Sequence, residues 1–329
     1  KVAMIPQEQV MFTISRDGYV KRVSMRSYGA ANDAMTGIKE GDHLIGYGEV
    51  NTLDNILFFT SKGTYGYVPV YEVDDAKWKE IGSHINSKIK ITSDEKITDA
   101  FIVKDFKTNA YMLSITRHGL VKKTAICEYE VSRNNKTMSN MKLLEDDEVV
   151  QTYVAYEEDE ILIASKKGYI TRYPISLIPA TSPRSKGVKA MNLVEDEIAS
   201  ALIYNNDNRQ LVVFSDNCAC KRMKLTDIDV TGRPTKGSML CKKVKSKPYH
   251  IAYISLHDLN DEIVIANSEI HKVVSKDIPL MAKDATFSAM LKGITDFYLL
   301  KELPKVELRE LPKQEEVEEE DFEALSLFE

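Results

Sequence analysis

The fold of this chain is decided by the segment VMFTISRDGYVKR at residues 10–22. A run of apolar and β-branched residues leads into the turn Arg16-Asp17-Gly18, and a second run leads away from it. Glycine readily adopts the positive φ that a tight hairpin turn requires. The segment therefore predicts a β-hairpin.

The same pattern returns along the chain with a nearly constant period. The turn positions 18, 63, 119, 168 and 218 are 45, 56, 49 and 50 residues apart, and a weaker sixth copy turns near residue 269. In the fifth copy Cys218 stands at the glycine position, preceded by Asn217. A period of about 50 residues leaves room for four short strands and predicts a propeller-like array.

We therefore expect an all-β, six-bladed, propeller-like domain with four antiparallel strands in each blade. The segments that lead into the hairpin turns, such as residues 161–164, are continuously apolar, which is typical of strands buried on both faces. Residues 1–7 precede the first hairpin and are expected to be a linker. Residues 305–329 are expected to be a disordered tail, because their acidic run cannot bury itself. The expected blades are residues 8–50, 51–106, 107–153, 154–203, 204–253 and 254–304.

Charge is segregated along the chain, so the net charge of -6 is a poor guide to its partners. Residues 305–329 hold ten acidic and three basic residues, whereas residues 161–250 hold sixteen basic and seven acidic residues. A strongly basic third of the body indicates a polyanionic partner. The acidic tail either competes with that partner for the basic surface or only solvates the chain.

Lysines and arginines recur at two places in the repeat, the hairpin and the loop between hairpins. A rim of such cations holds duplex DNA by its phosphates without reading the bases, so we predict that they bind DNA. The hairpin candidates are Lys21, Arg22, Lys122, Lys123, Lys166, Lys167, Arg172, Lys221, Arg222 and Lys224. The loop candidates are Arg184, Lys186, Lys189, Arg233, Lys236, Lys242 and Lys243.

The Ser-x-x-Gly-x-x-Lys-Arg hairpin, repeated about every 50 residues, resembles the C-terminal domains of the gyrase and topoisomerase IV A subunits. The resemblance covers about residues 8–300 and implies a β-pinwheel with duplex DNA bent around its outer rim. It also implies that the linker at residues 1–7 comes from a catalytic core outside this chain. It implies a non-catalytic, cofactor-free domain that presents a DNA segment to the strand-passing core of an ATP-hydrolysing type IIA topoisomerase. The implied partners are duplex DNA, the catalytic core of the same polypeptide and, through it, the ATPase subunit, in the bacterial cytoplasm at the nucleoid.

One stretch favours the topoisomerase IV branch, whose enzymes decatenate and relax DNA. Members of the gyrase branch carry a glycine- and arginine-rich box after the first hairpin, and the matching residues 27–37 here contain no arginine or lysine. Residues 184–187 and 233–237 partly match this box, because each stretch contains an arginine, a lysine and a glycine. A gyrase wrapping domain remains the alternative within the family.

Another function class shares the repeat period, namely the protein-interaction propeller with no DNA role. The basic stretch and the absence of Trp-Asp dipeptides argue against it.

Residues 145–148 resemble an acidic metal cluster, but the pattern recurs at residues 195–197, so we interpret it as a repeat turn. Four cysteines do not make a disulfide framework in a chain of 329 residues, and we expect a monomer in a reducing compartment, with no membrane partner.

Overall fold

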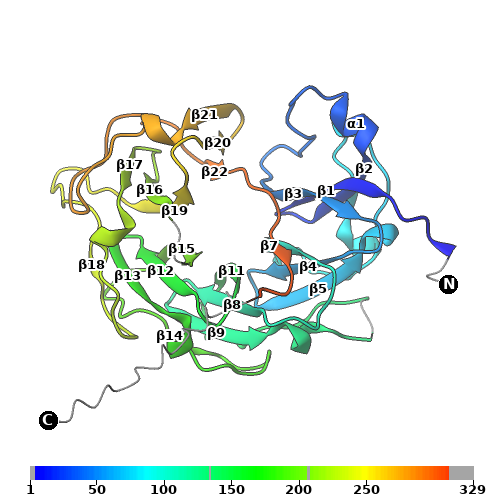
Figure 1. The fold of residues 1–329 in the computed structure, drawn as a ribbon, viewed down its shortest axis with the longest axis horizontal. Coiled ribbons are helices and arrows are strands. Elements are labelled where there is room, and N and C mark those ends of the chain that lie inside the picture. Colours follow the sequence, from blue (N-terminus) through cyan, green and yellow to red (C-terminus); the bar gives the residue numbers. More distant parts are fainter. Residues whose placement is uncertain (1–3, 133–134, 206–207, 311–329) are drawn as a thin grey trace, which may run out of the picture.

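The computed structural model describes residues 4–132, 135–205 and 208–310. In this part of the chain, six small, mainly antiparallel sheets stand around a ring (Figure 1), which confirms the all-β, six-bladed architecture. The described helices are short, and none is long and apolar enough to cross a membrane.

Each blade is built on a hairpin followed by a strand that faces the centre of the ring (Figure 1). Blade one contains β1 (Gln9–Ser15), β2 (Tyr19–Ser24) and β3 (Leu44–Asn51). Blade two contains β4 (Asn55–Thr60), β5 (Thr64–Pro69) and β7 (Ile97–Val103). Blade three contains β8 (Tyr111–Thr116), β9 (Leu120–Ala125) and β11 (Val149–Ala155). Blade four contains β12 (Glu160–Ser165), β13 (Tyr169–Pro174) and β15 (Ile198–Tyr204). Blade five contains β16 (Gln210–Ser215), β17 (Cys220–Met223) and β19 (Ile251–His257). Blade six contains β20 (Glu262–Ala266), β21 (Ile270–Val274) and β22 (Tyr298–Leu299).

Short helical segments follow the hairpins at the ends of the blades. A single α-helix, α1 (Met25–Gly29), follows β2 in the described part of the chain, and its N-cap Ser24 accepts a hydrogen bond from the main-chain N–H of Ser27 at 3.1 Å. The 3-10 segments are η2 (Val70–Glu72), η3 (Ile85–Ser87), η4 (Ile126–Tyr129), η5 (Ile175–Leu177), η6 (Leu225–Asp227) and η7 (Ser275–Asp277).

The predicted hairpin turns are present, including the one without glycine. Gly18 has a φ of 99°, and Cys218 reaches a φ of 62° at the equivalent position. The Cys218 side chain is fully buried, so the core holds this residue in a conformation that non-glycine residues rarely adopt.

The outermost strand of a blade comes from the following repeat. The strands β6 (Ser83–His84), β10 (Met138–Ser139), β14 (Val188–Lys189) and β18 (Ser238–Met239) pair with β2, β5, β9 and β13, respectively. In blade five a single bridge between Cys220 and Ser288 takes this place. Blades therefore overlap along the sequence, and the expected boundaries, such as 8–50 for blade one, omit the outer strand that completes the sheets of blades one to four.

The number of strands also varies around the ring. Blades one, three and four have four strands, blade two has five, and blades five and six have three among the described residues. The fifth strand of blade two is β23 (Lys305–Val306), which pairs in parallel with β7. The expected tail at 305–329 therefore begins too early. Its acidic run, at residues 315–321, lies outside the described residues.

A segment that begins with the last strand of blade six closes the ring, and we call residues 298–309 the closing segment. The main-chain N–H of Leu303 donates to the oxygen of Tyr47 in blade one at 2.8 Å. The segment then forms β23 in blade two. Figure 1 shows it in orange, running from β22 past β3 to β7.

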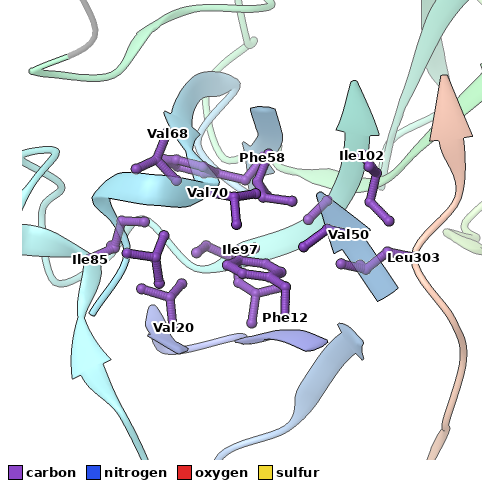
Figure 2. Packing of buried hydrophobic residues seen from close by; sticks show 14 of the residues in the cluster. Phe12, Val20, Val50, Phe58, Val68, Val70, Ile85, Ile97, Ile102 and Leu303 are labelled. Carbon is purple, nitrogen blue, oxygen red and sulfur yellow. The ribbon is translucent and has the colours of Figure 1, made fainter. Parts of the chain in front are cut away.

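Apolar contacts hold the closing segment in place. The side chain of Leu303 lies close to Val50 and Ile102 (Figure 2) and belongs to the core shared by blades one and two. At the start of the segment, the ring of Tyr298 stacks on His43 of blade one, with centroids 4.6 Å apart. Burying one leucine contributes about 1.5–3 kcal/mol, so this segment stabilises the junction.

The outermost strand approaches the hairpin so closely that it needs glycine where it begins. Gly187 has a φ of 80°, and a Cβ atom there would lie 2.3 Å from the Val121 oxygen. Gly237 repeats this geometry one blade later, at 2.3 Å from the Ile170 oxygen. Real Cβ atoms do not come this close to a carbonyl oxygen, so the shared strand depends on these two residues.

We expect Gly187→Ala to lower the free energy of unfolding by about 2–3 kcal/mol, because the added methyl group meets main chain and the backbone cannot keep its positive φ without strain. Urea unfolding followed by circular dichroism measures this change. Gly232→Ala is the matched control, because no heavy atom lies within 4 Å of its Cβ position. Equal stability of the two variants would contradict the role given to the close approach.

Candidate nucleic-acid interface

The lysine of the Lys-Arg hairpin motif is a structural residue in this fold. Lys21 and Lys221 are fully buried. The Lys21 ammonium donates to the main-chain oxygen of Trp78 at 2.7 Å, and the Lys221 ammonium donates to the oxygens of Lys283 and Ala285 at 2.6 and 2.7 Å. In both cases the acceptors belong to the following repeat. These two lysines fasten the shared outer segment and cannot reach a phosphate.

Blade three buries both of its hairpin lysines. The Lys122 ammonium donates to the hydroxyls of Thr124 and Tyr129. The Lys123 ammonium donates to the Ile175 oxygen at 3.1 Å and forms an ion pair with Glu157 at 3.3 Å. The prediction that Lys21, Lys122, Lys123 and Lys221 contact DNA is therefore corrected, because their charged groups are already bound inside the protein.

Burial shifts the protonation of these side chains. Desolvation lowers the pKa of Lys122 to about 7 and the pKa of Lys21 and Lys221 to about 8, because the interior disfavours the charged form. Within the described residues no carboxylate forms an ion pair with these three ammonium groups.

Four arginines of the candidate set, Arg22, Arg172, Arg222 and Arg233, are half-buried and hold neighbouring segments together. Each donates to main-chain or side-chain acceptors across the blade boundary or within its own hairpin. The bonds are Arg22 to Asp75 (2.8 Å), Arg172 to Glu160 (2.5 Å) and the Ile228 oxygen (3.1 Å), Arg222 to the Ile278 oxygen (3.1 Å), and Arg233 to the oxygens of Leu177 (3.0 Å) and Lys189 (2.7 Å). Their first role is to hold blades together, so they are poor choices for charge reversal.

A signal for this structural role was present in the repeat itself. The position of Lys21 is occupied by Gly66 in the second copy and by Thr171 in the fourth. Thr171 bonds Thr235 at 2.8 Å, so a hydroxyl there also joins the hairpin to the next repeat. A position that accepts glycine, threonine or lysine supports the fold locally and is not selected for a surface charge.

The remaining candidates are exposed, and most lie on the outermost segments of blades three to five. Residues 184–189 lead into and form β14, Lys236 precedes β18, and the loop at 241–250 follows β18. Figure 1 shows β14 and β18 on the outside of the ring. We call the basic rim the exposed cations Arg184, Lys186, Lys189, Lys236, Lys242, Lys243, Lys245 and Lys247. The exposed candidates outside it are Lys166, Lys167 and Lys224.

Lys245 and Lys247 were not predicted, although the sequence Lys242-Lys243-Val244-Lys245-Ser246-Lys247 continues the same charge pattern. No ion pair joins any rim cation to a carboxylate in the part of the chain that the structure describes. The rim is therefore an uncompensated positive surface, which attracts polyanions.

The acidic repeat turns serve the hairpins, as predicted. A carboxylate oxygen of Asp147 accepts from the main-chain N–H of His118 at 3.0 Å, and Asp196 accepts from that of Lys167 at 3.0 Å. These carboxylates cap hairpin turns. Among the described residues, no group of three or more His, Cys, Asp and Glu residues could hold a metal ion.

The centre of the ring offers no comparable attraction for a polyanion. A cavity of about 800 Å³ opens there, lined by the inner strands of the blades. Its charged lining is balanced, with Arg16, Lys96, Lys166 and Lys301 opposite Glu148, Asp216, Glu262 and Asp296. The uncompensated surface is therefore on the outside of the ring.

Comparisons with known proteins agree with this fold. The family "DNA gyrase C-terminal domain, beta-propeller" matches residues 9–46, 54–104, 110–155, 159–205 and 209–256, which lie in the first five blades. The chain is 34% identical over 250 residues to the A subunit of DNA topoisomerase 4 from Bacillus subtilis (strain 168), covering 75% of this chain and 31% of that protein. It is 32% identical over 273 residues to the corresponding protein from Staphylococcus epidermidis (strain ATCC 12228 / FDA PCI 1200), covering 83% and 34%. The chain thus spans about a third of the length of these relatives.

Solved structures show the same ring. The C-terminal domain of DNA topoisomerase IV superposes with a TM-score of 0.80 and 33% identity, covering 90% of this chain and 94% of that one. The C-terminal domain of DNA gyrase A superposes with a TM-score of 0.70 at 20% identity, covering 90% and 100%, and shows the shared fold.

Lys122→Met should flatten the dependence of stability on pH between pH 7 and 10. Because the pKa of Lys122 is lowered from 10.5 to about 7, the unfolded chain binds a proton in this range that the folded chain has released. Folding stability therefore rises with pH, by up to about 1.4 kcal/mol per pH unit from this group. Urea unfolding at pH 7, 8 and 9 measures the slope. The exposed Lys104→Met should keep the native slope, and an unchanged slope in Lys122→Met would disprove the assignment.

Proposed function

The chain belongs to the DNA gyrase C-terminal domain family, as a β-propeller of the topoisomerase IV A-subunit type, and on that premise we propose that it binds and bends duplex DNA. The DNA would lie against the basic rim on the outside of blades three to five. Binding would be independent of sequence, because exposed lysines and arginines contact phosphates and not base edges.

The observation that carries this proposal is the uncompensated charge of the rim. Eight exposed cations gather on three neighbouring blades, with no ion pair to a carboxylate in the described part of the chain. The buried hairpin lysines do not add to this surface. Contacts would therefore follow one arc of the ring and not its whole circumference.

The energy of bending sets the number of contacts that are needed. Bending a short duplex by tens of degrees costs about 1–6 kcal/mol. One or two exposed ion pairs contribute about 0–1 kcal/mol each and cannot offset this. Eight cations acting together release many counterions from DNA, so they can hold a bent duplex at moderate salt.

The role of the domain within a larger enzyme follows from the same premise. We propose that it presents the bent DNA to the strand-passing core of topoisomerase IV, which lies outside this chain, and so supports decatenation and relaxation of DNA in the bacterial cytoplasm. Holding duplex DNA needs no catalytic group and no cofactor. The topoisomerase IV type is supported over gyrase by the absence of arginine and lysine from residues 27–37 and by the 33% against 20% identity to the two solved domains.

Charge reversal of four rim lysines tests the location of the DNA. We expect the combined change Lys186→Glu, Lys189→Glu, Lys236→Glu and Lys243→Glu to weaken binding of a random-sequence 40-bp duplex by at least about 100-fold at moderate salt. The slope of log affinity against log salt concentration should fall by about 3–4, because four phosphate contacts are lost. Fluorescence anisotropy across a salt series measures both quantities.

The control carries the same charge change on blade two, at the exposed residues Lys62, Lys90, Lys104 and Lys107. It should keep most of the affinity and nearly the native slope. Equal losses in the two variants would show that only net charge matters and that no focused rim exists. Absence of binding by the native chain at low salt would overturn the DNA-binding proposal itself.

A further inference from the structure

A pocket of about 420 Å³ lies at the end of the basic rim, between blades four and five. The turn of blade four forms one side, residues 191–196 form a second, and the loop at 241–250 covers a third. The volume lies in the range of small-molecule sites, about 300–1,000 Å³, and is too small for a duplex. Duplex binding to the rim therefore leaves this pocket without an explanation.

Five lysines supply most of the charge that lines the pocket. Asp196 is the only carboxylate among the described residues that line it, and one of its oxygens already accepts from the Lys167 and Glu197 main-chain N–H groups. No ion pair to the lining lysines occurs within the described residues. The lining lysines are Lys167, Lys236, Lys242, Lys243 and Lys245. So many like charges around one space repel one another, and a compact multivalent anion would relieve that repulsion.

Tyr169 gathers two of these lysines at one point. The Lys236 and Lys243 ammonium groups lie 4.6 and 5.5 Å from the centre of its ring. Hydrogen bonds and charge from the same two lysines lower the pKa of the Tyr169 hydroxyl. The tyrosine thus holds two positive groups close together, as a phosphate group would require.

The segment at 191–196, which carries no lysine, adds apolar surface to the pocket. Val194 lines the pocket from this segment, is 65% exposed, and lies next to Leu193. The loop at 241–250 adds the apolar residues Val244, Pro248 and Tyr249. A purely inorganic anion would not use this surface, whereas a flat apolar group attached to the anion would bury it.

From this arrangement we infer that the pocket binds a single nucleotide, with its phosphates between the lysines around Tyr169 and its base against the apolar surface at Val194. The inference goes beyond duplex binding, and for a free nucleotide it does not require duplex binding; for a nucleotide of bound DNA it rests on the proposed function. Two sources supply this chemistry, a free nucleotide or an unpaired nucleotide of bound DNA. Both present a planar base joined to phosphate, and the test separates them.

Isothermal titration calorimetry with the full chain and no DNA tests the free nucleotide. ADP should bind more tightly than pyrophosphate or adenosine alone, because only ADP uses both the lysines and the apolar surface. Lys243→Ala should weaken ADP and pyrophosphate alike, by about tenfold. Val194→Ser should weaken ADP about fivefold and leave pyrophosphate unchanged, because it removes only apolar contact.

The matched controls keep the chemistry of each change and move it away from the pocket. Val230 is 51% exposed and does not line the pocket, so Val230→Ser should bind ADP like the native chain. Lys104→Ala should do the same. If pyrophosphate binds as tightly as ADP, or if Val194→Ser has no effect on ADP, the pocket is an anion patch and the inference is wrong for the free nucleotide.

The DNA source is tested by comparing a perfect duplex with one that carries a single unpaired adenosine. Tighter binding of the bulged duplex, lost in Val194→Ser but not in Val230→Ser, assigns the pocket to unpaired nucleotides even if ADP does not bind. Failure of both ADP and the bulge preference overturns the inference. The affinity for the perfect duplex, measured in the same titrations, reports separately on the DNA-binding proposal.

Discussion

The ring depends on the outer segments by which one repeat pairs with the blade formed by the repeat before it. Main-chain groups on such a segment must be paired, because an unpaired buried carbonyl is costly. Lys21 and Lys221 meet this need with ammonium groups that donate to several carbonyls of the following repeat at once. Arg22 and Arg222 add bonds to the neighbouring segment, at Asp75 and the Ile278 oxygen. The joint between blades is therefore polar and directional as well as apolar.

This arrangement leaves the last blade without a successor. Blade six has three strands in the described part of the chain, and the closing segment provides the connection back to blade one in another way. Leu303 inserts into the core between blades one and two, and β23 extends the sheet of blade two. The ends of the ring are thus joined by a short segment and not by a shared blade, so this junction differs from the other joints.

The lysines that join the blades are buried, so they add no positive charge to the surface. A hairpin ammonium group that is buried among main-chain carbonyls is not available to a phosphate, so the proposed DNA-binding surface consists mainly of loop residues. Residues 161–250 hold sixteen basic and seven acidic residues, and acidic turn residues of the repeat, such as Asp147 and Asp196, accept hydrogen bonds from hairpin turns. The basic rim and the pocket beside Tyr169 are two parts of one surface.

The sequence by itself determined the number of blades, the positions of the hairpins and the basic character of residues 161–250, because each is encoded locally by turn residues, apolar runs and charge. It also identified Arg184, Lys186, Lys189, Lys236, Lys242 and Lys243 as exposed cations. Only the tertiary structure decided which strand completes each blade, because that pairing joins residues about 60 apart, such as Val20 and Ser83. It alone also showed that Lys21, Lys122, Lys123 and Lys221 are interior, since a lysine in a strand has the same local sequence whether its ammonium group meets solvent or the carbonyls of the next repeat.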